Sequence, residues 1–189
     1  MGYSTDFNGS LKFNKPVAYE LKDYIKKFNE TRRMKRDIEK IKENYPNWED
    51  LCFEGCLGYE GAYFIGGNGF LGQDEDGTII NYNYSPKGQP GLWCQWIINE
   101  HDELEWDGNE KFYNYVEWLK YLIKHFFEPL GYILNGDIAW QGEDEEDFGI
   151  IHVEDNCVTT QEGNKYYSMD DFETKVLIAE LEKRGYTVS

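Results

Sequence analysis

Residues 112–126 read Phe-Tyr-Asn-Tyr-Val-Glu-Trp-Leu-Lys-Tyr-Leu-Ile-Lys-His-Phe. Apolar side chains recur there at the i, i+3, i+4 and i+7 spacing that places them on one face of a helix. Pro129 and Gly131 follow, and both residue types are typical of a helix end. This stretch is the strongest helical signal in the chain, so we expect an amphipathic helix whose apolar face packs on a sheet.

Short segments rich in β-branched and aromatic residues lie on both sides of this helix, bounded by turn-forming residues. Asp155-Asn156 predicts a hairpin turn between two of them. Strands and helices do not alternate regularly, which favours an α+β fold: a mainly antiparallel, twisted sheet with about three helices packed on it. The expected strands are residues 6–13, 62–65, 78–84, 92–98, 104–106, 132–140, 149–154 and 157–161.

The length of 189 residues predicts a single domain over residues 1–189. Residues 17–45 are expected to form a basic helical segment, with a bend or break near residues 29–31 where the apolar spacing changes phase. A last helix is expected at residues 165–189, either packed in the domain or appended to it.

The charge of the chain is strongly negative and unevenly distributed. Lys and Arg number 19 and Asp and Glu number 36, giving a formal charge of −17; the first 45 residues carry +4 and the remainder −21. Such a molecule repels nucleic-acid phosphate at long range and attracts a basic protein surface, so no direct nucleic-acid binding is expected. The candidate face for a basic partner is the run Glu143, Asp144, Glu145, Glu146 and Asp147.

Several function classes find no support in the sequence. No apolar stretch approaches the 18 residues of a membrane span and no export signal is visible at the start, so a cytoplasmic protein with four free cysteines is expected. The G-x-G-x-x-G match at residues 67–72 is followed by acidic, turn-forming residues, which favours a glycine-rich hairpin over a dinucleotide site. The sequence indicates no metal site, no cofactor and no catalytic residue, and the balance favours a protein without enzymatic activity.

Two segments remain as candidates for a ligand site. In a strand, Trp93 and Gln95 point to one face, where an aromatic ring beside an amide could bind a flat ligand, although a core strand explains the pattern as well. In a helix, Arg32, Arg33 and Arg36 lie within about one turn and could bind a phosphate or carboxylate, although they could equally pair with the protein's own acidic residues.

Four segments resemble a family of small acidic hypothetical proteins from bacteria and phages. They are Thr31-Arg-Arg-Met-Lys-Arg-Asp37, Gly88-Gln-Pro-Gly-Leu-Trp-Cys-Gln-Trp96, Glu110-Lys-Phe-Tyr-Asn-Tyr-Val-Glu-Trp-Leu-Lys-Tyr-Leu-Ile123 and Trp140-Gln-Gly-Glu-Asp144. The resemblance covers most of residues 1–160. It implies a soluble intracellular protein of the kind carried by phages or prophages, and it assigns no catalytic residue.

Three functions are compatible with these features. The first is a non-enzymatic acidic binding or inhibitor protein that docks on a basic partner surface, for instance the groove of a nucleic-acid-handling protein. The alternative is a nucleotide-binding or small-anion-binding protein, or an enzyme, that uses the segment from Arg32 to Arg36 together with Trp93 and Gln95. The third is a structural component that oligomerises through exposed aromatic residues.

Overall fold

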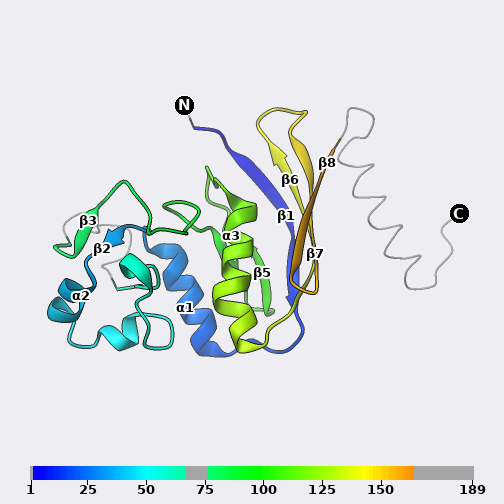
Figure 1. The fold of residues 1–189 in the computed structure, drawn as a ribbon. Helices are drawn as coiled ribbons and strands as arrows, with labels where there is room; N and C mark the ends of the chain where they lie inside the picture. Colours follow the sequence, from blue (N-terminus) through cyan, green and yellow to red (C-terminus); the bar gives the residue numbers. More distant parts are fainter. Residues whose placement is uncertain (1, 67–75, 164–189) are drawn as a thin grey trace, which may run out of the picture.

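The computed structural model describes residues 2–66 and 76–163 (Figure 1). The glycine-rich motif at residues 67–72 and the helix expected at residues 165–189 lie outside the described residues. Within the described part, the α+β prediction is confirmed: three α-helices accompany a six-stranded antiparallel sheet. No helix in these two ranges is long and apolar enough to cross a membrane.

The main sheet has the strand order β4-β5-β1-β6-β7-β8, so the first strand of the chain lies in its interior. Strand β1 pairs with β6 along its whole length, from Thr5 opposite Gly142 to Phe13 opposite Leu134. The predicted hairpin turn joins β7 to β8, and both of its residues, Asp155 and Asn156, have the positive φ that such tight turns require. The strands are β1 (Thr5–Phe13), β4 (Trp96–Ile98), β5 (Glu103–Trp106), β6 (Leu134–Gly142), β7 (Phe148–Glu154) and β8 (Cys157–Glu162).

Helices α1 (Tyr19–Glu30) and α3 (Tyr115–Leu122) lie beside each other on the sheet (Figure 1). Helix α1 buries Leu21, Tyr24, Ile25 and Phe28, a spacing that forms one apolar stripe. Helix α3 continues into the π-helix η4 (Ile123–Phe127) and the 3-10 helix η5 (Glu128–Leu130).

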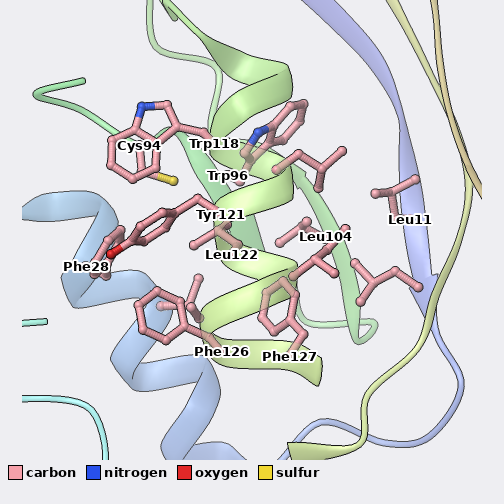
Figure 2. Packing of buried hydrophobic residues seen from close by; sticks show 14 of the residues in the cluster. Leu11, Phe28, Cys94, Trp96, Leu104, Trp118, Tyr121, Leu122, Phe126 and Phe127 are labelled. Atoms are coloured by element: carbon pink, nitrogen blue, oxygen red, sulfur yellow. The ribbon is translucent and has the colours of Figure 1, made fainter. Parts of the chain in front are cut away.

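One large apolar core lies between these helices and the sheet (Figure 2). Trp118, Leu122, Phe126 and Phe127 come from the α3–η4 segment, and Phe28 comes from α1. Leu11, Trp96 and Leu104 face them from the strands, and all eight side chains are fully buried. Edge-to-face aromatic contacts such as Phe28–Trp118 add directional packing to the burial of apolar area.

A smaller lobe is built from residues 31–65 and a short two-stranded sheet. It contains β2 (Lys35–Arg36), α2 (Ile38–Asn44), η1 (Trp48–Leu51), η2 (Tyr59–Gly61) and β3 (Ile79–Asn81). The side chain of Asp37 accepts hydrogen bonds from the backbone of Glu39 and Lys40 and thereby caps α2. Ile41 and Phe64 form part of a second, smaller apolar cluster.

Two sequence-based predictions of local structure are wrong. Residues 32–36 do not form the helical turn expected of them: the helix breaks in the expected region, where α1 ends at Glu30, but the chain stays non-helical until α2 begins at Ile38. The reason is long-range pairing, because the backbone N–H groups of Arg33 and Lys35 donate to carbonyl groups of Leu92 and Tyr84. The strands expected at residues 62–65 and over 92–95 are also absent; the second region becomes extended strand only at Trp96.

Candidate functional site

A pocket of about 940 Å³ opens between three segments that are distant in sequence. Asn29 and Glu30 at the end of α1 form one wall. Residues 91–95, which include Trp93 and Gln95, form the second, and residues 107–114 form the third. The structure therefore brings Trp93 and Gln95 to one pocket, although neither is in a strand.

The side chains of Gln95 and Trp106 hold the wall at residues 107–114 in place. Gln95 donates from Nε2 to the carbonyl oxygen of Glu110 at 3.0 Å, and its own Oε1 accepts from the indole of Trp106 at 3.1 Å. Lys111 and Asn114 hold φ values of 63° and 55°, a region that non-glycine residues rarely occupy. Strained backbone of this kind often accompanies binding sites, and here it shapes the rim of the pocket.

The three asparagine side chains of the pocket donate hydrogen bonds to other groups of the protein. Asn29 and Asn109 donate from Nδ2 to Oδ2 of Asp107, at 2.9 and 2.8 Å, and Asn114 donates to the carbonyl oxygen of Pro90 at 2.7 Å. Because these partners can only accept, each amide nitrogen must point at its partner, and each amide oxygen is left without one among the described residues.

The charge of the pocket is negative. Glu30, Asp107 and Glu110 contribute carboxylates to the lining, and Lys111 contributes one cation. The side chain of Glu110 is exposed and makes no hydrogen bond or ion pair within the described residues. An anion in this pocket would meet net repulsion, whereas a cation would be attracted.

The acidic turn, residues 143–147, connects β6 to β7 at the end of the sheet where β1 begins, since Thr5 lies opposite Gly142 (Figure 1). Glu143 accepts from the backbone N–H of Ser4 at 2.8 Å, and Asp147 accepts from the hydroxyl of Tyr3 at 2.6 Å. The hydrogen bond to Asp147 raises the pKa of Tyr3. No described basic side chain pairs with Glu143, Asp144, Glu145 or Asp147, so this turn presents negative charge to solvent.

Of the three arginines considered for anion binding, one lies near Trp93. The guanidinium of Arg32 lies 4.3 Å from the ring of Tyr82 and 5.9 Å from the ring of Trp93, and its Nε donates to the carbonyl oxygen of Tyr82. Because residues 32–36 are not helical, Arg33 and Arg36 point elsewhere, and neither lines the pocket.

Arg36 is buried in an internal ion pair. Its Nη1 contacts the carboxylate of Asp76 and donates to the hydroxyl of Thr78 at 2.7 Å. Burial alone would raise the pKa of Asp76, but the hydrogen bond from the Thr78 backbone and the charge of Arg36 outweigh it and lower the pKa. Arg36 thus binds residues of the loop before β3 and stabilises that loop.

Arg33 is buried without a carboxylate partner among the described residues. Its Nη2 donates to the carbonyl oxygen of Phe64 at 2.6 Å and its guanidinium lies 4.2 Å from the ring of Phe28, while Nε and Nη1 have no partner in the described part of the chain. Burial lowers the pKa of Arg33 to about 10. With 2% of its surface exposed, it cannot reach a ligand in solvent.

The outer face of the sheet holds an Asp–His pair that does not form a catalytic triad. His152 and Asp137 lie opposite each other on β7 and β6, with 2.6 Å between Nδ1 and Oδ1. Ser10 lies opposite Asp137 on its other side, so the aspartate separates the serine from the histidine. A serine nucleophile needs the histidine between itself and the aspartate. Across the two described ranges, no group of three or more His, Cys, Asp or Glu side chains could hold a metal ion.

Sequence reasoning named Trp93 and Gln95 but missed the polar residues around them. Asn29, Asp107 and Glu110 carry no local motif that would single them out in the sequence. The chain matches no protein-family model, no curated protein and no solved structure. The pocket and the acidic turn therefore carry the functional proposal.

Proposed function

We propose that the protein is a non-enzymatic acidic binding protein that docks its acidic end on a basic surface of another protein. The acidic end comprises the pocket and the acidic turn. The observation that carries the proposal is their junction: Tyr3 donates from its backbone N–H to the hydroxyl of Tyr113 on the pocket wall and from its own hydroxyl to Asp147 in the turn. One residue thus connects the two sources of negative charge.

The carboxylates at this end are available to a partner. Glu110 and Glu145 are exposed and form no contact with a described basic side chain. Long-range attraction of this kind speeds association and weakens as salt is added. A partner whose basic groove binds nucleic acid would be inhibited by such occupancy.

The nucleotide-binding or anion-binding alternative has weaker support. Arg33 and Arg36 are buried away from Trp93, and the pocket that contains Trp93 is lined by more carboxylates than cations. Four unpaired cysteines accord with a cytoplasmic protein, which we include in the proposal together with the phage or prophage setting implied by the resemblance.

The test is calorimetric titration with a short oligolysine peptide at low and at high salt. We expect binding at low salt that weakens as salt rises. Glu110→Gln and Glu145→Gln should each lower the affinity roughly two- to fivefold, the size of an exposed ion pair. Glu43→Gln, which removes an exposed carboxylate from α2, is the matched control and should change the affinity less. No binding at low salt, or an equal loss in the control, would contradict the proposal.

A further inference from the structure

We propose that the pocket binds a guanidinium group, so that an arginine side chain of the basic partner is its occupant. This inference rests on the proposed function, because it names the chemical group by which the acidic end holds its partner. Three properties of the pocket support it: the hydrogen-bonding groups left available, the placement of the carboxylates and the aromatic wall.

The amide side chains of the pocket leave acceptors available. The amide nitrogens of Asn29, Asn109 and Asn114 are engaged within the protein, so three amide oxygens remain. Both ends of the Gln95 amide are also engaged. A ligand that uses these oxygens must bring donors, and a guanidinium brings five N–H donors in a plane and no acceptor.

The carboxylates of Asp107 and Glu110 line the same pocket as these amide oxygens. Asp107 receives the amide groups of Asn29 and Asn109 and also the backbone N–H of Asn109 at 2.8 Å, which orders it in place. Glu110 is exposed and pairs with no side chain in residues 2–66 or 76–163, so its two oxygens can accept a pair of parallel N–H donors. A neutral flat ligand such as a nucleobase would leave this charge without a partner.

The aromatic wall favours a guanidinium over an ammonium group. Trp93 lines the pocket, and one guanidinium of this protein, that of Arg32, already lies 5.9 Å from its ring. A guanidinium is planar, weakly hydrated and stacks on aromatic faces, whereas an ammonium is compact and strongly hydrated. Beside Leu92 and Cys94, which also line the pocket, the less hydrated cation loses less on entering.

The experiment compares an oligoarginine peptide with an oligolysine peptide of the same length, by calorimetry at low salt. Both peptides carry the same charge, so the general attraction to the acidic end contributes similarly to both affinities. The ratio of the two affinities therefore reports the preference for a guanidinium. We expect the arginine peptide to bind about tenfold more tightly, as one charge-assisted hydrogen-bonded pair would give. Glu110→Gln should bring the ratio close to one, while Glu145→Gln should weaken both peptides equally and keep the ratio.

Trp93→Leu is the second pocket variant, with its folding checked by thermal unfolding. It should lower the ratio because it removes the stacking face while keeping an apolar side chain. Equal affinities of the two peptides for the unchanged protein would overturn the guanidinium inference and leave the proposed function standing. A ratio that survives both Glu110→Gln and Trp93→Leu would overturn the pocket as its location. Failure of both peptides to bind would overturn the proposed function itself.

Discussion

The hydroxyl of Tyr3 donates a hydrogen bond of 2.6 Å to Oδ2 of Asp147, across 144 positions of sequence. The same hydroxyl accepts from the backbone N–H of Asp144 at 3.2 Å. The hydroxyl of Tyr3 therefore accepts one hydrogen bond and donates another within the acidic turn, and it links Asp144 to Asp147. The shape of the charged surface depends on this residue near the start of the chain.

Replacing Asp147 with Asn should lower the pKa of Tyr3 towards its ordinary value. A carboxylate that accepts from a phenol stabilises the protonated phenol, and its charge opposes formation of a phenolate beside it. The measurement is an NMR titration of carbon-labelled tyrosine, with Tyr3→Phe used to assign the signal. An unchanged titration of Tyr3 in the Asn variant would show that Asp147 does not control it.

Asp76→Asn should lower the free energy of unfolding by about 3 kcal/mol, because it leaves the buried guanidinium of Arg36 without its counter-charge. The pKa of Asp76 is lower in the folded chain, so the carboxylate stabilises the fold at every pH above its unfolded pKa of about 4. The difference between the two proteins should shrink as the pH falls through the folded pKa.

Urea unfolding over a range of pH values measures this difference. The double variant Arg36→Met with Asp76→Asn is the control, since it removes both charges and should lose less stability than Asp76→Asn alone. A single variant as stable as the unchanged protein at neutral pH would rule out the ion pair as a stabilising contact.

Arg33→Met should keep the free energy of unfolding within about 1 kcal/mol of its present value. The substitution gives up the hydrogen bond to the Phe64 carbonyl but removes a buried charge that has two unsatisfied nitrogen atoms. Arg33→Ala should lose about 2 kcal/mol or more, because it leaves a cavity beside Phe28. A large loss in the Met variant would reveal a partner that compensates the charge.

The four cysteines should react with a thiol reagent in two classes. Cys56 and Cys157 are exposed, whereas burial raises the pKa of Cys52 to about 11 and of Cys94 to about 12. Because the thiolate is the reactive form, we expect two fast reactions at mildly alkaline pH and two that require unfolding. Spectrophotometry with Ellman's reagent, with and without denaturant, counts each class. Rapid reaction of all four in the folded protein would contradict the burial of Cys52 and Cys94.

Local patterns predicted those parts of the fold that depend on local physics. The hairpin at Asp155-Asn156 follows from the preference of these residues for positive φ, and the apolar face of α3 follows from its spacing. The start of that helix could not be predicted, because the side chains of Gln95 and Trp106 hold the carbonyls of Glu110 and Asn109 outside it. Those contacts join segments that only the tertiary fold brings together.

The arginines are a second case in which tertiary contacts override a local pattern. Their spacing would place Arg32 and Arg36 one above the other in a helix, but the backbone of Arg33 and Lys35 pairs with distant residues and no helix forms there. Only part of the pocket could be predicted from the sequence, for a related reason. Trp93 and Gln95 stand out as a local pair, whereas Asn29 and Asp107 meet across 78 positions and neither is unusual by itself.

The interior place of β1 has a consequence for how the molecule assembles. Both neighbours of this strand, β5 and β6, lie about a hundred residues or more further along, at Leu104 opposite Leu11 and Trp140 opposite Phe7. On the ribosome, residues 5–13 emerge before both of their partner strands and stay unpaired until residues 103–142 have been made. Pairing over such separations slows folding, so the closing of the sheet around β1 should be the late, rate-limiting event.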